Sequence, residues 1–203
     1  MPTIDGITVS PPDADVRIDP VSYFGSPGPV ELEIGCGKGG FLLRRAREYS
    51  QLRLLGIEWA NKYYRYAADR MARWGLTNVR IMRTDARNFV LHHLVPDCLA
   101  ALHTYHPDPW PKKRHHKRRL FQPDFVAAAT VALQPGGRWA IQTDHADYFA
   151  WITEVMAGQE RLEPIDYEDE AFGIVDNQTQ TNYEIKYLRE GRHFYRLAFR
   201  KKG

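Results

Sequence analysis

The sequence predicts an α/β fold, a doubly wound and mostly parallel sheet that is closed by an antiparallel C-terminal hairpin. Short apolar segments alternate with segments of helical periodicity, in five successive β-α units, from residue 29 to residue 157. In the last segment, 184–202, Tyr195, Leu197 and Phe199 alternate with polar or small residues, as in a strand with one exposed face. Strands that alternate with helices form parallel sheets covered on both faces, and the final segment adds the antiparallel hairpin.

The predicted strands are short apolar runs that end at a polar residue or a glycine turn. The fourth is apolar throughout its first half, which indicates a strand buried on both faces. The third alternates between apolar and polar positions before Asp85. In chain order the strands are PVELEI (29–34), LRLLGIEW (52–59), NVRIMRTD (78–85), CLAALHTYH (98–106) and RWAIQTD (138–144).

The predicted helices follow these strands and carry apolar residues three and four positions apart. Gly75 ends the second helix, and the third has a proline near its start and Pro-Gly-Gly after its end, as helices often do. The named helical segments are FLLRRAREY (41–49), KYYRYAADRMARWG (62–75), PDFVAAATVALQPGG (123–137) and HADYFAWITEVMA (145–157).

Composition limits the domain organisation and the kinds of site. Residues 1–29 are rich in proline and glycine and predict an irregular leader, and residues 30–203 predict one domain. The N-terminus has no signal-peptide pattern and no apolar run is long enough to cross a bilayer, so a cytoplasmic protein is expected. Cys36 and Cys98 show no disulfide or metal spacing, and the histidines form no ligand pattern, so no metal is expected.

One segment, PDPWPKKRHHKRR at 107–119, concentrates positive charge. Without the six lysines and arginines at 112–119, the chain has 22 basic against 25 acidic residues, although the whole chain carries a net charge of +3. A local cationic run of this kind is typical of a surface that docks a polyanion such as RNA. A targeting signal and an idle solvated loop are the alternatives.

Each predicted strand ends near a carboxylate. In a doubly wound sheet, ligands bind outside the carboxyl ends of the strands, so five carboxylates in these places predict a binding site. One or two of them are alternatively helix N-caps, a common place for aspartate. The five residues are Glu33, Glu58, Asp85, Asp108 and Asp144.

The glycine loop GCGKGG fits two ligand templates. Gly35, Gly37 and Gly40 match the dinucleotide fingerprint, whereas Gly35, Gly37 and Gly39 match the version that binds S-adenosylmethionine. Glu33 favours the second template, because a carboxylate would repel a pyrophosphate but pairs with the ammonium and sulfonium of S-adenosylmethionine. Glu58 suits ribose hydroxyls in either case, and Asp85 can accept a hydrogen bond from an adenine amino group.

A set of motifs from Val30 to Arg200 closely resembles the tRNA (guanine-N7)-methyltransferase family. They are ELEIGCGKG, GIEWANKY, TDA, HPDPWPKKRHHKRRL, QTDHADY and TNYE, in this order. The resemblance implies a Rossmann-like class I methyltransferase fold and methyl transfer from S-adenosylmethionine to a guanosine in the variable loop of tRNA. His106 departs from the family pattern, in which an apolar or aromatic residue is commoner at this position.

The resemblance also implies roles for individual residues. Asp108 is implied as the catalytic residue and, with Glu33, Glu58 and Asp85, as a cofactor contact. Substrate contacts are implied at Lys112, Asp144, Thr181, Asn182, Tyr183 and Glu184. RNA contacts are implied at Arg114, His115, His116, Lys117, Arg118 and Arg119.

The opening of the basic segment suggests how such a site works. Pro107, Pro109 and Pro111 fix backbone φ angles on both sides of Asp108, so the carboxylate is held rigidly. Guanine N7 carries a lone pair and no proton, so the reaction needs positioning more than a base. A fixed carboxylate reads the base and favours the cationic product, while the neighbouring cations hold phosphates.

Three other functions fit parts of the sequence. An exocyclic-amine methyltransferase often has an Asp-Pro-Pro-aromatic loop, which DPWP resembles without the second consecutive proline. A nicotinamide-dependent oxidoreductase would need a catalytic Tyr-Lys or His-Asp pair, and none is placed convincingly. A non-enzymatic RNA-binding module would need no carboxylates at the strand ends. We expect a monomer or a homodimer without an obligate partner subunit.

Overall fold

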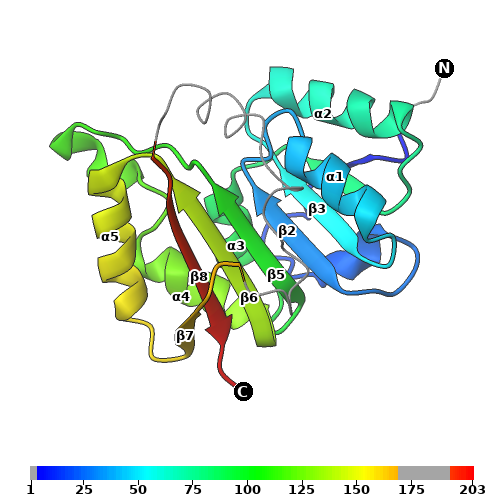
Figure 1. The fold of residues 1–203 in the computed structure, drawn as a ribbon. Helices are drawn as coiled ribbons and strands as arrows, with labels where there is room; N and C mark the ends of the chain where they lie inside the picture. Colours follow the sequence, from blue (N-terminus) through cyan, green and yellow to red (C-terminus); the bar gives the residue numbers. More distant parts are fainter. Residues whose placement is uncertain (1–3, 169–192) are drawn as a thin grey trace.

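The computed structural model describes residues 4–168 and 193–203, and these form an α/β domain around one twisted sheet (Figure 1). The sheet of the described residues has eight strands in the order β1-β4-β3-β2-β5-β6-β8-β7. All neighbours pair in parallel except β8, which is antiparallel to both β6 and β7. The strands are β1 (Thr8–Val9), β2 (Val30–Ile34), β3 (Arg53–Ile57), β4 (Val79–Met82), β5 (Leu99–Tyr105), β6 (Leu133–Thr143), β7 (Leu162–Ile165) and β8 (Tyr195–Lys201).

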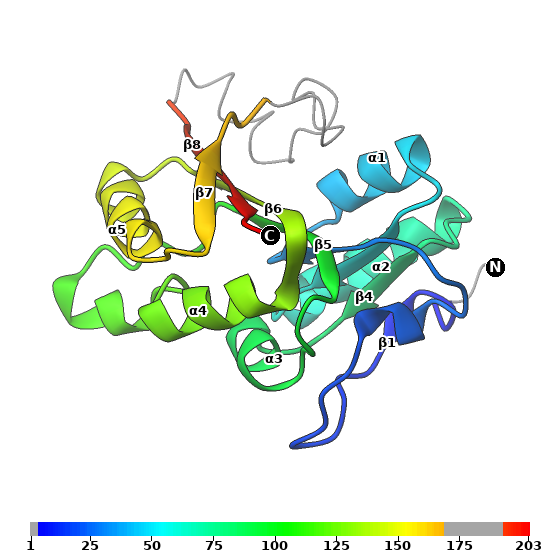
Figure 2. The same ribbon diagram turned by 90° about the horizontal axis from the view of Figure 1, so that it is seen from below.

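Helices cover both faces of the sheet, as the alternation of strands and helices predicts (Figure 2). The helices α1 (Gly40–Glu48) and α2 (Asn61–Arg73) bury apolar residues against one face in a cluster of their own. The second cluster fills the other face beneath α3 (Ala86–His92), α4 (Pro123–Ala132) and α5 (Ala146–Ala157). Two short 3₁₀ turns, η1 (Pro20–Tyr23) and η2 (Lys113–Arg118), complete the described elements. The predicted doubly wound fold is therefore confirmed.

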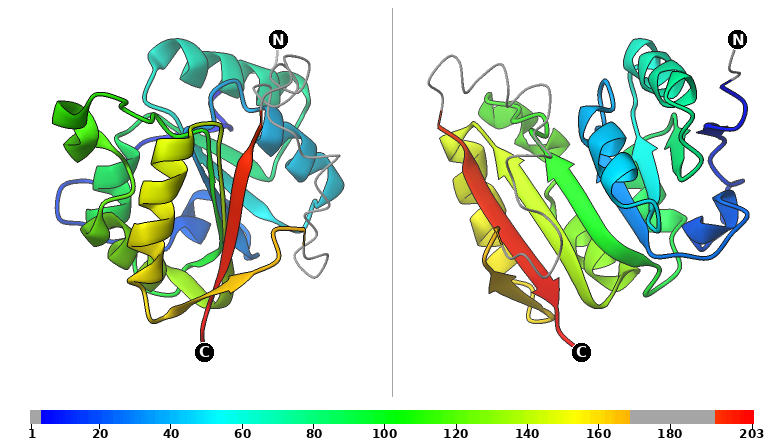
Figure 3. Two further views of the ribbon diagram at one scale, coloured as in Figure 1. Left: turned by 60° about the vertical axis from the view of Figure 1, so that its left-hand side comes forward. Right: turned by 45° about the vertical axis from the view of Figure 1, so that its right-hand side comes forward.

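The structure also adds elements that the sequence pattern does not identify. The segment predicted as an irregular leader contains η1 and the edge strand β1, in which Thr8 pairs with Ile81. The short helix α3 follows β4 directly, and its seven residues are too few to show a clear period. The predicted hairpin at 184–202 lies partly outside the described residues, and the antiparallel partner of β8 at the sheet edge is β7 (Figure 3).

The sheet order puts a ligand crevice at its centre. The chain runs outward from β2 through β3 to β4, then returns to β5 and runs outward in the opposite direction. The carboxyl ends of β2 and β5 therefore form the point where ligands bind in folds of this kind. Gly39 lets α1 begin close to α2 here, because its φ is +67° and a Cβ atom would lie 2.5 Å from Met71 Cε.

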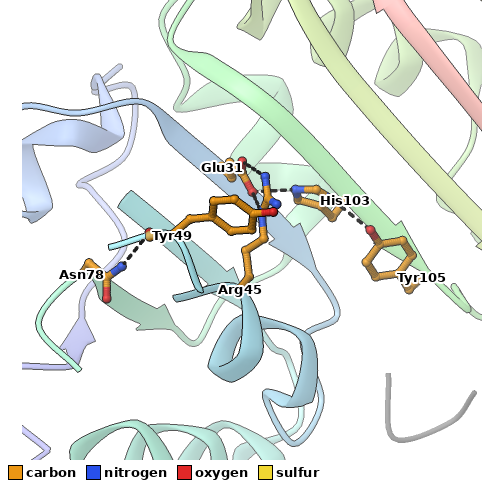
Figure 4. A network of polar contacts seen from close by, with 6 residues as sticks. All are labelled: Glu31, Arg45, Tyr49, Asn78, His103 and Tyr105. Atoms are coloured by element: carbon orange, nitrogen blue, oxygen red, sulfur yellow. Dashed lines mark hydrogen bonds and ion pairs between the residues drawn. The ribbon is translucent and has the colours of Figure 1, made fainter. Parts of the chain in front are cut away.

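A buried polar network holds α1 against the centre of the sheet (Figure 4). Arg45 on α1 donates two hydrogen bonds to Glu31 on β2, at 2.9 Å from Nε and 2.7 Å from the terminal nitrogen. His103 on β5 joins Glu31 to Tyr105, with its Nε2 atom 3.0 Å from the Glu31 carboxylate and its Nδ1 atom 3.0 Å from the Tyr105 hydroxyl. Although burial opposes it, hydrogen bonding to His103 and Arg45 lowers the pKa of Glu31 to about 2.

Candidate active site

A cavity of about 820 Å³ lies at the carboxyl ends of β2, β3, β4 and β5. This volume lies within the range of sites for small molecules and cofactors. Six of the residues predicted to bind the cofactor line it, namely Glu33, Gly35, Gly37, Glu58, Asp85 and Asp108. Gly39 packs beneath the cavity against Ala67 and Met71 instead, so its role is to let the loop approach α2.

Glu33 lies next to the last residue of the buried strand β2 and lines the cavity. Its side chain is buried, and none of the described residues gives its Oε2 atom a hydrogen-bond partner. Burial raises the pKa of Glu33 to about 8, because desolvation outweighs the attraction of the Arg44 guanidinium and Glu58 adds repulsion. A cationic ligand group beside this oxygen would satisfy it. The residue therefore fits the ammonium or sulfonium of S-adenosylmethionine and does not fit a phosphate.

Glu58 closes the glycine loop as well as lining the cavity. One carboxylate oxygen accepts from the Gly37 backbone amide at 2.9 Å, and the other accepts from the Ala60 amide at 2.7 Å. These bonds tie the end of β3 to the loop after β2 and hold the carboxylate in one orientation. Each oxygen still has acceptor capacity, so Glu58 can receive hydroxyl groups of a bound ribose.

Asp85 caps α3. Its Oδ1 atom accepts from the Asn88 backbone amide at 3.0 Å, which is the N-cap arrangement of a helix start. The same residue lines the cavity after β4. The helix-cap alternative therefore holds for Asp85, and the cap fixes the carboxylate at the edge of the site.

The Pro-Asp-Pro-Trp-Pro loop after β5 brings Asp108 to the mouth of the cavity. Two non-glycine residues of this turn have left-handed backbones, His106 with φ 52° and Trp110 with φ 43°. Such conformations cost about 1–3 kcal/mol each and persist where the surroundings fix them. The His106 amide donates to the Gln142 carbonyl at 2.8 Å, which anchors the start of the turn. Asp108 is exposed and lines the cavity.

His106 joins this loop to the end of β6. The Gln142 side-chain oxygen accepts hydrogen bonds from Arg196 Nε, at 3.2 Å, and from the Tyr167 hydroxyl, at 3.4 Å. The Gln142 amide nitrogen therefore faces His106 Nε2, at 3.1 Å, and donates to it. This bond leaves the His106 proton on Nδ1, which lies 3.8 Å from Asp144.

The basic run forms η2 beside the cavity, and most of its cations are exposed. Lys112, Lys113, Arg114, Lys117 and Arg118 are all accessible to a polyanion. Arg118 lines the cavity and places its guanidinium 5.0 Å from the centre of the Trp110 ring. His115 meets the same ring edge-on. The run therefore stands directly next to Asp108.

Arg119 has a different role from the one implied by the family resemblance. Its side chain is only 2% exposed, so it cannot reach a phosphate in this conformation. The guanidinium donates to the Pro109 carbonyl at 2.9 Å, pairs with Asp147 at the start of α5 and stacks over Tyr148. The RNA contact implied at Arg119 stays an untested prediction, and in this structure the residue anchors the Asp108 loop to α5.

The remaining predicted residues lie outside the cavity or outside the described part of the chain. Lys112 is exposed at the start of η2, and Asp144 lies at the end of β6 beside His106. Thr181, Asn182, Tyr183 and Glu184 are not among the described residues. Conversely, the sequence did not single out Phe41, Tyr63 or Tyr105 as lining residues. Only the position of Tyr105 just before the proline loop could have indicated one of them.

Comparison with known proteins gives the family of the chain. A family model described as "Putative methyltransferase" matches residues 27–197. A tRNA (guanine-N(7)-)-methyltransferase from Geobacter metallireducens is 34% identical, over 95% of this chain and 92% of its own length. The chain belongs to this family. A second member, from Bordetella pertussis, is 38% identical over 95% of this chain and 75% of its own.

Solved structures show the fold at lower identity. TrmN from Thermus thermophilus has a TM-score of 0.59 and 18% identity, covering 86% of this chain and 44% of its own. A phosphoethanolamine N-methyltransferase from Haemonchus contortus, solved with S-adenosyl-L-methionine, has a TM-score of 0.52 and 15% identity, covering 90% of this chain and 51% of its own. This member of the tRNA (guanine-N(7)-)-methyltransferase family therefore has the fold of the S-adenosylmethionine-dependent methyltransferases.

Two further observations concern the described residues of this methyltransferase. None of its described helices is both long and apolar enough to cross a membrane. Its described histidine, cysteine, aspartate and glutamate side chains form no cluster of three or more suited to a metal ion.

Proposed function

We propose that this chain transfers a methyl group from S-adenosylmethionine to N7 of a guanosine in tRNA, in the variable loop. One observation supports this most strongly. The cavity contains a buried carboxyl group with an unsatisfied oxygen, and its mouth holds a rigid carboxylate beside an exposed cationic run. The first feature suits a cationic methyl donor, and the second suits an RNA base with its phosphates.

Three carboxylates and the glycine loop would hold the methyl donor. Glu33 would pair with a cationic group, Glu58 would accept the ribose hydroxyls, and Asp85 would accept from the adenine amino group. Gly35 and Gly37 line the cavity where the backbone approaches the ligand. Bound S-adenosylmethionine supplies an electrophilic methyl group on a sulfonium, so the residues need only orient it.

Asp108 would act on the target base. Guanine N7 has a free lone pair, so no side chain has to remove a proton before methyl transfer. The fixed Asp108 carboxylate can accept hydrogen bonds from the Watson–Crick edge of guanine and stabilise the positive charge that develops on the ring. Holding the lone pair in line with the methyl group supplies the rest of the rate enhancement.

The exposed cations would dock the RNA, and other substrate contacts would complete the site. Lys112, Arg114, Lys117 and Arg118, with His115 and His116, would hold phosphates near Asp108. Asp144 and the segment Thr181–Glu184 would contact the substrate. We expect the enzyme to act in the cytoplasm as a monomer or a homodimer, without a metal or an obligate partner subunit.

The decisive experiment identifies the modified nucleoside. The protein is incubated with bulk tRNA lacking the modification and with labelled S-adenosylmethionine, and the tRNA is then digested to nucleosides. N7-methylguanosine is expected, and the Asp108→Ala variant should form little of it. Label on an exocyclic amine would mean that the DPWP loop serves the alternative chemistry. Absence of label, with native folding and cofactor binding, would contradict the proposal.

A further inference from the structure

The outer face of α2 carries a row of aromatic and cationic side chains. Tyr63, Tyr66, Arg70, Arg73 and Trp74 follow helical spacing, so they lie on one side of the helix. Tyr66 is 46% and Trp74 52% exposed, although solvent-facing helix positions are normally polar. The opposite side buries small apolar residues, namely Ala67, Ala68, Met71 and Ala72. Single exposed aromatics are ordinary, but a row of them along one helix indicates an interaction surface.

Positive charge is concentrated in the same region. Residues 38–74 contain nine basic and three acidic residues, and the run at 112–119 contains six basic residues and no acidic one. Outside these two segments the chain has 13 basic and 22 acidic residues. The chain is therefore acidic except at two cationic segments. One of them is the basic run beside Asp108, and the proposed function does not yet give a role to the other.

The cationic side chains of this region are held against the aromatic ones. The Arg47 guanidinium on α1 lies 4.4 Å from the centre of the Trp74 ring, and Lys38 Nζ lies 5.8 Å from that of Tyr66. Arg70 donates to the Lys38 carbonyl at 3.2 Å. Lys38, Tyr66, Arg70, Arg73 and Trp74 together line an open groove. Beside the groove, Asp69 forms an exposed ion pair with Arg73, at 2.7 Å.

The groove adjoins the active-site cavity. Lys38 lines both of them, and Ala60 and Tyr63 at the start of α2 line the cavity too. Arg118 of the basic run also lines that cavity. At about 1.5 Å per residue, the 13 residues of α2 extend about 20 Å away from it. A polyanion that places one nucleotide in the cavity can therefore reach both cationic segments.

We propose that this face of α2, with Lys38 and Arg47, is a second RNA-binding surface for the same tRNA. The inference rests on the proposed function. Lysine and arginine side chains would hold phosphates along the helix, and the exposed tyrosines and tryptophan would stack on bases or riboses. Cations interleaved with exposed aromatic rings are what an RNA strand needs. An acidic protein segment would require the cations but not the row of rings.

Two sets of variants test the surface without touching the cavity. Arg47→Gln/Arg73→Gln removes two exposed cations that do not line the cavity, and Trp74→Ala removes a ring but no charge. The matched control is Arg161→Gln/Lys202→Gln, which removes two exposed cations near β7, at the other end of the sheet (Figure 1). All variants should keep the parental melting temperature and affinity for S-adenosylmethionine.

The readouts are tRNA binding across a salt series and steady-state methylation. Losing two phosphate contacts should flatten the slope of log K against log salt by about 1.4–1.8. The double α2 variant should also raise the KM for tRNA about tenfold or more, with kcat unchanged. Trp74→Ala should raise KM and leave the slope as it is, and the control should match the parent.

Parental slope and KM in both α2 variants would overturn the inference, and so would an equal loss in the control. The salt slope is a binding measurement and does not depend on the product. If the parent formed no N7-methylguanosine, the proposed function would fail separately from the RNA-binding surface.

Discussion

At the scale of single residues, the site depends on carboxylates whose surroundings differ. Glu33 is buried with an unsatisfied oxygen, Glu58 is held by two backbone amides, and Asp85 caps a helix. Asp108 stands exposed on a proline-fixed turn. In the proposed function, the same functional group would therefore meet a cation, a ribose, an amine or a base, according to where each strand end places it.

The raised pKa of Glu33 predicts that binding of S-adenosylmethionine releases a proton. With a pKa of about 8 in the free protein, Glu33 is mostly protonated at pH 7. A cationic ligand group favours the carboxylate, so binding should expel the proton and the affinity should rise from pH 6 to pH 8. Calorimetry in two buffers with different ionisation enthalpies measures the proton count. Equal heats in both buffers for the parent would contradict this, and Glu33→Gln serves as the control that has no proton to lose.

Asp108 should matter for turnover and not for folding. Asp108→Asn keeps the size of the side chain but removes the charge that favours the cationic product. Loss of one such electrostatic contact typically costs about 10²–10³ in kcat. Single-turnover methylation at saturating tRNA measures the loss of turnover, and the circular dichroism spectrum checks that the fold is unchanged. Near-parental turnover in this variant would remove Asp108 from the mechanism.

At the scale of elements, the basic run combines two functions that mutations can separate. Replacing Arg114, Lys117 and Arg118 with glutamine should flatten the slope of log K against log salt by about 2–2.7, because three phosphate contacts are lost. Affinity for S-adenosylmethionine should change little. Arg119→Gln should leave the salt slope unaltered, because this side chain is buried against Pro109 and Asp147. It should instead lower the melting temperature and kcat, since the Asp108 loop loses its anchor. Similar slopes for the triple variant and the parent would exclude the run as the docking surface.

Which elements are predictable from the sequence follows from how local their causes are. The strands that line the site are short segments rich in apolar residues, and the glycine loop and the proline turn are local backbone signals, so their positions and their carboxylates follow from the sequence. The burial of Arg119 depends on Asp147, 28 residues away on another helix, and no local pattern shows that pairing. The pairing of β7 with β8 likewise joins segments far apart in the chain. The short helix α3 and strand β1 are set by their neighbours more than by their own periodicity.

At the scale of the whole molecule, buried charge joins the two halves of the sheet beneath the site. Glu31 on β2 pairs with Arg45 on α1 and with His103 on β5, the strands that flank the ligand crevice. His103 carries the network on to Tyr105, which lines the cavity. Removing one partner of such a buried pair leaves the other charge without compensation and typically costs about 3–5 kcal/mol.

This network predicts how stability depends on pH. The pKa of Glu31 falls from 4.5 to about 2 on folding, so its stabilisation is complete above pH 4.5 and is lost as the pH falls toward 2. Burial also lowers the pKa of His103 below 6.5, so acidification below that value already costs stability, because the imidazole of the unfolded chain takes up a proton that the buried one resists. The Glu31 part alone is worth about 3 kcal/mol, from a shift of about 2.5 pH units at 1.36 kcal/mol each.

Urea unfolding at pH 7 and at pH 3 measures how much of this stability is lost on acidification. The double variant Glu31→Gln/Arg45→Met removes the buried pair but keeps the side chains near their original volume, so it should lose less stability than the parent over this interval. Equal losses in the two proteins would show that other carboxylates control the acid unfolding.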